Sequence, residues 1–121
     1  MVGRITGHVD ALIDGVVVWE NLFGTGDAQE LGYRVSMNMA SVLTDDRAER
    51  VAFQDQIKRL YTERSRIVHG RKHPNASEAA DLRRQVQSLT LRALRRIVTA
   101  HSRLIGADAA TFMKFVISDS Y

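Results

Sequence analysis

An arginine and a histidine near the end of one predicted helix are the residues of this chain best suited to chemistry. They are Arg64 and His69, in the stretch LYTERSRIVHGRKHP that spans residues 60–74. Arginine holds phosphate oxygens with a planar, permanently charged fork, and a histidine that titrates near neutrality accepts or donates protons. Such a pair suits phosphodiester cleavage: imidazole moves protons, and guanidinium holds the negative charge that grows in the transition state.

Arg64 occupies a position where the helical pattern calls for an apolar side chain. A guanidinium on a buried stripe costs several kcal/mol unless it is paired or solvated. One way to offset this cost is an ion pair inside the protein with an acid of the first predicted helix. The acid is either Glu20 or, nearer the start of that helix, Asp10 or Asp14. The other way is for this part of the stripe to face a groove or a subunit interface where an anion binds.

Five positions separate Arg64 from His69. In a regular helix this spacing amounts to about 140° around the axis and about 7.5 Å along it, so the two side chains lie on different faces. The last helical turn must therefore loosen for them to converge. Gly70 is the permissive residue for such an ending.

Several neighbours of this pair have more than one reading. Glu20 either pairs with Arg64, or orients His69, or lies at the outer edge of the apolar stripe. Tyr61, one turn before Arg64, is expected to be a core or interface residue rather than a catalyst.

The residues that flank the histidine are basic. They could guide an RNA backbone, or they could form a solvated helix end. The set is Arg66, Arg71, Lys72 and His73. The same two readings apply to the arginines of the last predicted long helix, where a solvated face is the default: Arg83, Arg84, Arg92, Arg95 and Arg96.

No metal or cofactor site is predicted. His69 and His73 have the spacing of a helical metal pair, but Gly70 and Pro74 interrupt the helix there and no acid lies nearby. The chain has no cysteine, which excludes disulfides, thiolate nucleophiles and cysteine zinc sites.

Composition indicates one globular domain of a cytoplasmic protein. The chain has 121 residues, 45% of them hydrophobic, which is enough for a single core. Its longest apolar run, GVVVW, is far shorter than the roughly 20 residues of a membrane span, and no signal peptide is visible. Residues 1–50 carry four basic and eight acidic residues, net −4, whereas residues 51–121 carry thirteen basic and six acidic ones, net +7. The basic half contains the Arg64 stretch, as expected of a protein that meets phosphates.

The periodicity of apolar residues predicts an all-α fold. Apolar positions recur every three or four residues over 5–23, 31–42, 53–68 and 82–104, and a shorter set begins at about residue 108. Predicted helix starts are Asp27 with Glu30 as a capping box, the link Thr44 to Asp46, and Ser77. Short connections then favour an up-and-down bundle of four main helices plus a short C-terminal helix.

The stretch LYTERSRIVHG resembles the R-x4-6-H signature of the HEPN superfamily, most closely the Apea-like HEPN group. In that group an arginine-serine pair leads into an ending of aliphatic residue, histidine and glycine. The upstream segments WENLF and LGYRVSMNMASVL are similar to the group's first two helices. The resemblance covers about residues 8–105.

The resemblance implies an all-α bundle that commonly dimerises, with the two motifs facing each other across a cleft. Many members are metal-independent ribonucleases of toxin–antitoxin, phage-defence or RNA-processing systems. It implies that Arg64 binds and polarises the scissile phosphate and that His69 acts as general base or acid while the ribose 2′-OH attacks. The implied partners are RNA, a second copy of the chain, and an antitoxin or another domain of a longer chain, since the resembling stretch often ends one.

Ser65 departs from the pattern of other HEPN branches, which often have Asn, Asp or His after the arginine. A hydroxyl forms hydrogen bonds but shares proton chemistry less well. The departure keeps open a non-catalytic HEPN module that dimerises or binds RNA within a larger defence protein. A third reading is a helical interaction domain in which Glu20 satisfies Arg64.

Overall fold

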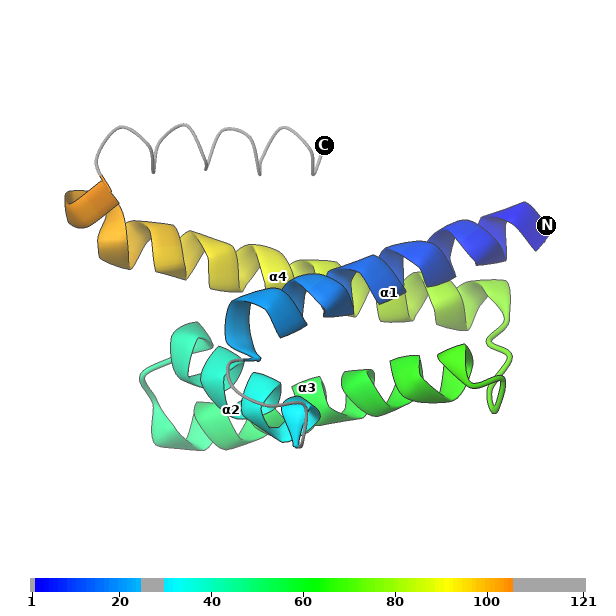
Figure 1. Cartoon of the computed structure of the whole chain (residues 1–121), viewed down its shortest axis with the longest axis horizontal. Helices are drawn as coiled ribbons and strands as arrows, with labels where there is room; N and C mark the ends of the chain where they lie inside the picture. The colour runs from blue at the N-terminus through cyan, green and yellow to red at the C-terminus, as the bar shows by residue number, and fades with distance from the viewer. Residues whose placement is uncertain (1, 25–29, 106–121) are drawn as a thin grey trace.

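Four helices pack as a bundle in the computed structural model, which describes residues 2–24 and 30–105, with side chains over 5–24 and 30–100 (Figure 1). They are α1 (Val2–Phe23), α2 (Leu31–Leu43), α3 (Arg47–Val68) and α4 (Ala76–Ile105). Within these ranges there is no strand, so the predicted all-α class is confirmed. The short helix predicted from about residue 108 lies outside the described residues.

The order of helix directions differs from a simple up-and-down bundle. Helix α3 runs opposite to α2 and to α4, as predicted for neighbours joined by short connections (Figure 1). Helices α1 and α4 run in the same direction: His8 lies beside Arg83, and Trp19 beside Thr90. Helix α2 also runs in the same direction as α1, so the chain reverses first at the α2–α3 link and not after α1 (Figure 1).

The start of α3 is capped as predicted. Asp46 is the N-cap, and its carboxylate accepts a hydrogen bond from the Glu49 backbone N–H at 2.9 Å. The Thr44 hydroxyl donates to the Glu49 carboxylate at 2.6 Å. The first bond satisfies a backbone donor that the first helical turn leaves without a partner, and the second holds the Glu49 side chain beside the cap.

Two predicted helix starts are wrong. Glu30 has a left-handed backbone with φ of 59°, so it precedes α2 as N-cap and is not the third residue of a capping box; Asp27 lies outside the described residues. At α4 the capping residue is Asn75 and not Ser77: Asn75 Oδ1 accepts from the Glu78 backbone N–H at 2.8 Å. The Glu78 carboxylate in turn accepts from the Asn75 N–H at 3.4 Å, which completes a capping box two residues before the predicted cap Ser77.

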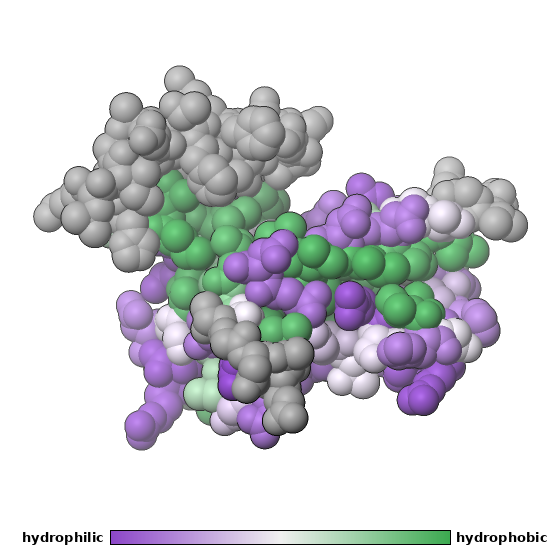
Figure 2. All heavy atoms as spheres, viewed as in Figure 1, coloured by the Kyte–Doolittle hydropathy of each residue, from purple (hydrophilic) through white to green (hydrophobic). Residues whose placement is uncertain are grey.

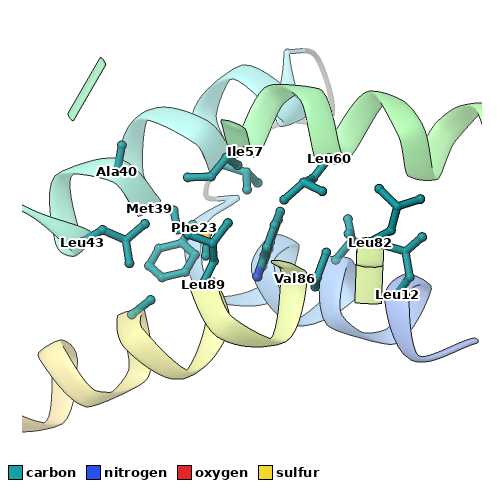
Figure 3. Close-up of a cluster of buried hydrophobic side chains, with 14 residues drawn as sticks. Leu12, Phe23, Met39, Ala40, Leu43, Ile57, Leu60, Leu82, Val86 and Leu89 are labelled. Atoms are coloured by element: carbon teal, nitrogen blue, oxygen red, sulfur yellow. The ribbon is translucent and has the colours of Figure 1, made fainter. Parts of the chain in front are cut away.

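One hydrophobic core joins all four helices. Figure 3 shows labelled side chains of every helix pointing toward one another between the α1–α4 and α2–α3 layers. The Trp19 ring is fully buried, and its indole N–H donates to the Thr90 hydroxyl at 2.7 Å. The core consists of Leu12, Val16, Trp19, Phe23, Val35, Met39, Ala40, Leu43, Ile57, Leu60, Leu82, Val86, Leu89 and Ala93.

Apolar side chains also reach the surface. On the face shown in Figure 2 they gather over α1 and the adjoining part of α4, whereas the region over α2 and α3 is mostly polar. On α1 the exposed ones are Val17, Val18 and Leu22. Across the described helices, none combines the length and hydropathy that spanning a membrane requires.

Two glycines of α1 provide a test of its packing on α4. A Cβ at Gly15 would lie 2.5 Å from Cγ1 of buried Val86, whereas a Cβ at Gly7 would meet nothing within 4 Å. Alanine gains about 1 kcal/mol over glycine inside a helix, but overpacking a core costs about 1–3 kcal/mol. We expect Gly7→Ala to raise the free energy of unfolding and Gly15→Ala to lower it, as measured by urea denaturation. Equal effects of the two substitutions would contradict the α1–α4 contact.

Candidate functional site

Helix α3 ends in a regular Schellman motif. Gly70 has φ of 71°, the left-handed backbone that glycine adopts without strain. The Arg71 N–H donates to the Arg66 carbonyl at 2.8 Å, and the Gly70 N–H donates to the Ile67 carbonyl at 3.1 Å. These two bonds place His69 at the C-cap, as the last residue before the chain turns away.

His69 is exposed and stays in helical register. Its backbone N–H donates to the Ser65 carbonyl at 3.0 Å, the bond of an ordinary α-helix. Its side chain forms no hydrogen bond or ion pair with any part of the chain that the structure describes. The loosening that would let His69 converge with Arg64 does not occur. Within one chain the two side chains therefore remain on different faces of α3.

Arg64 lies on the core side of α3 and has an acidic partner. Its Nη2 is 3.8 Å from Oε1 of Glu20, and each of these side chains is 22% exposed. Its Nε is buried and has no hydrogen-bond partner. Of the three acids that the sequence offered, Asp10 and Asp14 are exposed and Glu20 is the one beside Arg64. The guanidinium is thus anchored on one side, and one of its donors is unused.

Tyr61 holds the Glu20 carboxylate. The Tyr61 hydroxyl donates to Glu20 Oε2 at 2.8 Å, and the Arg64 guanidinium carbon is 5.9 Å from the centre of the Tyr61 ring. A Cβ at Gly32 of α2 would lie 3.0 Å from that ring, so the absence of a side chain there lets the ring lie against α2. Of the roles considered for Glu20, the structure shows pairing with Arg64 and no contact with His69. We call Glu20, Tyr61 and Arg64 the arginine cluster.

The arginine cluster keeps Tyr61 protonated. Burial, followed by the hydrogen bond to Glu20 and the charge of Glu20, raises the pKa of Tyr61 from 10.0 to about 12. The phenol therefore stays protonated well above neutral pH and donates its hydrogen bond to Glu20. The sequence placed Tyr61 in the core or at an interface, and it packs against the core. Its bond to Glu20 was not predicted, although Tyr61 and Arg64 lie on adjacent turns of α3.

The basic residues near His69 are not equivalent. The Lys72 ammonium is hydrogen-bonded to the Glu63 carboxylate and lies 3.8 Å from Glu78, so it ties the connector to α3 and α4. Arg66 is 3.4 Å from the same Glu63 carboxylate and is half exposed. Arg71 and His73 are exposed and have no ion pair within the described chain. Arg71 and His73 are therefore better placed than Lys72 to meet a ligand.

Glu63 provides a pH test of the connector. The hydrogen bond from Lys72, together with the charges of Lys72, Arg66 and Arg59, holds the pKa of Glu63 below its ordinary value of 4.5. A lowered folded-state pKa stabilises the fold above the unfolded pKa, and this contribution is lost as pH falls through the folded pKa. We expect acid-induced loss of stability below about pH 4.5 to be shallower in Glu63→Gln than in the wild type. Parallel curves of unfolding free energy against pH would contradict the Glu63–Lys72 contact.

Metal-binding groups do not gather in the described structure. No three side chains of the metal-binding types lie close enough there to hold an ion. His69 and His73 are both exposed, on either side of the Gly70 turn. That these two histidines do not bind a metal stays a prediction.

Chemically, the site offers a partly exposed guanidinium held by Glu20 and an exposed imidazole at the end of the same helix. The first group suits binding of a phosphate oxygen, and the second suits proton transfer. Comparisons with protein-family models, with curated proteins and with solved structures found no match for this chain.

Proposed function

We propose that this chain is a metal-independent endoribonuclease of the HEPN type, with Arg64 and His69 as its catalytic residues. The observation that carries the proposal is the state of Arg64. Its guanidinium is held on the core side of α3 by an ion pair with Glu20 at 3.8 Å, and the side chain is still 22% exposed. A charge positioned before substrate arrives needs little reorganisation when negative charge develops on a phosphate.

The proposed reaction is internal transesterification of RNA. The His69 imidazole takes the proton of a ribose 2′-OH, and the 2′ oxygen attacks the adjacent phosphorus. Arg64 donates hydrogen bonds to the non-bridging oxygens, where charge increases. The bond to the 5′ oxygen breaks, and that oxygen takes a proton from solvent water, to which the protonated His69 later returns its own. The products are a 2′,3′-cyclic phosphate and a 5′-hydroxyl, and no metal ion takes part.

A homodimer is part of the proposal. Arg64 faces Glu20 and His69 faces solvent, so one chain alone does not direct both groups at one phosphate. A second copy can supply the missing group. The exposed α1 residues Val17, Val18 and Leu22 support association, because apolar side chains on a surface favour contact with a partner. Control by an antitoxin, or by a further domain of a longer chain in the cytoplasm, completes the proposed toxin or phage-defence role.

A non-catalytic HEPN module is the second candidate. The observation that favours it is the ion pair itself, since Glu20 already balances the charge of Arg64. In this case Arg64 stabilises the bundle, while Arg71 and His73 bind RNA without cutting it. Ser65, whose carbonyl accepts the His69 N–H, would then have no part in proton transfer.

The dependence of cleavage on the ribose 2′-OH separates these two functions. Wild-type protein is incubated in EDTA with an end-labelled RNA and with the same RNA carrying 2′-O-methyl groups throughout. We expect cleavage of the first and none of the second, because the methylated oxygen has no proton to give and cannot attack. Cleavage of the methylated RNA would contradict the 2′-OH mechanism, and cleavage of neither would favour the module.

A further inference from the structure

A groove of about 320 Å³ lies between α3 and α4. No residue of the arginine cluster lines it. Its apolar lining includes Phe53 of α3 and Leu89 of α4, and Leu89 is buried. Arg84 and Arg92 of α4 also line it, together with exposed Ser88. A shallow concave surface with an aromatic ring and two guanidinium groups differs from an ordinary solvated helix face.

Arg92 is fixed by the aromatic ring and not by an acid. Its guanidinium carbon lies 5.0 Å from the centre of the Phe53 ring, a cation–π contact. No carboxylate pairs with Arg92 among the described residues. A cation–π contact with a ring does not use the N–H groups of Arg92 in a bond to a carboxylate, so they stay available for phosphate oxygens. Arg92 is therefore both held in place and free to bind.

Hydrogen bonds of side-chain amides hold the residues that line the groove in place. Gln85 Oε1 accepts a hydrogen bond from Arg59 at 2.9 Å and one from Gln56 at 3.5 Å. Gln85 Nε2 donates to Asp81 at 2.8 Å, and Asp81 is also 3.8 Å from Arg84. The one acid of this network is therefore engaged, whereas the Arg84 side chain remains 75% exposed. The local charge is positive.

We propose that this α3–α4 groove binds a segment of single-stranded RNA. Arg84 and Arg92 contact backbone phosphates, bases stack on the Phe53–Arg92 pair, and Gln56 and Ser88 form hydrogen bonds with bases or ribose hydroxyls. Single-strand binding sites commonly combine cations with stacking surfaces in this way. An acidic peptide would use the cations but not the stacking surface. The inference rests on the proposed function for the choice of RNA, and it adds a binding site for the strand that is separate from Arg64 and His69.

The test is RNA binding under conditions that prevent cleavage. Every protein carries His69→Ala, and the probe is a fluorescein-labelled oligouridine whose anisotropy is measured over a salt series in EDTA. We expect Arg92→Gln to weaken binding roughly fivefold and to reduce the slope of log affinity against log salt by about 0.7, the value for one phosphate contact on a single strand. Arg95→Gln is the matched control, because Arg95 is an exposed arginine of α4 that does not line the groove.

A second substitution tests the groove without a change of charge. Ser88→Leu fills part of the groove, and we expect it to weaken oligouridine binding with an unchanged salt slope. Circular dichroism and thermal melting confirm that each variant is folded. Equal losses for Arg92→Gln and Arg95→Gln would overturn the proposal, as would an unaffected Ser88→Leu protein or equally tight binding of poly-glutamate.

Failure of the groove and failure of the ribonuclease give different results. If the protein cuts RNA but binds it equally well after Arg92→Gln, the ribonuclease proposal stands and the groove proposal is wrong. If the protein never cuts RNA but needs Arg92 and Ser88 to bind it, the groove proposal stands and the ribonuclease proposal is wrong.

Discussion

His69→Ala is expected to lower the rate of RNA cleavage by about 10²- to 10⁴-fold, the usual contribution of a general acid or base. The fold should be unaffected, because the His69 side chain is exposed and forms no hydrogen bond or ion pair within the described chain. A single-turnover assay with end-labelled RNA in EDTA measures the rate. Thermal melting of the same samples checks the fold.

His73→Ala is the matched control for His69→Ala. His73 is also an exposed histidine, and it lies on the other side of the Gly70 turn. We expect its loss to weaken RNA binding modestly and to leave the single-turnover rate at saturating protein unchanged. Similar rate losses in the two variants would show that the connector contributes positive charge and shape, and not a specific proton transfer at His69.

Arg64→Gln is expected to lower cleavage by about 10²- to 10³-fold, as removal of one preorganised donor to a transition-state charge does. It should also lower the free energy of unfolding by about 1 kcal/mol, because Glu20 loses its cationic partner. Tyr61 still donates to Glu20, which limits this loss. Cleavage rates and urea denaturation on the same preparation measure the two effects separately.

The double variant Glu20→Gln with Arg64→Gln separates the catalytic role of Arg64 from its structural role. With both charges removed, no unpaired carboxylate remains, and we expect stability to return toward that of the wild type. Cleavage should stay as low as in Arg64→Gln alone. Recovery of cleavage together with stability would mean that Arg64 serves only as the partner of Glu20.

Periodicity located the core because burial follows helical geometry. The stripe Leu12, Val16, Trp19 and Phe23 is buried as predicted. Periodicity does not fix helix direction, which is why the parallel arrangement of α1 and α4 was missed. The cap at Asn75 was missed because Ser77 is an equally good capping residue and the choice depends on where the chain leaves Pro74.

Only part of the site was predicted, because contacts between helices depend on packing and not on local spacing. The pattern identified Arg64 as an arginine in need of a partner, but three acids of α1 were open and only packing selects Glu20. The role of Lys72 depends on Glu63, a contact across the Gly70 turn that no helical spacing predicts. The α3–α4 groove joins Phe53 to Arg92, which are far apart in the chain, so no local spacing indicates it.

The most direct test of the central claim is one gel. Purified wild-type, His69→Ala and Arg64→Gln proteins, each checked for fold, are incubated with a mixed-sequence, end-labelled RNA in EDTA at concentrations that favour dimers. If Arg64 and His69 are catalytic, the wild type alone cleaves the RNA, and its products end in 2′,3′-cyclic phosphates. An intact RNA in the wild-type lane, or equal cleavage in all three lanes, would contradict it.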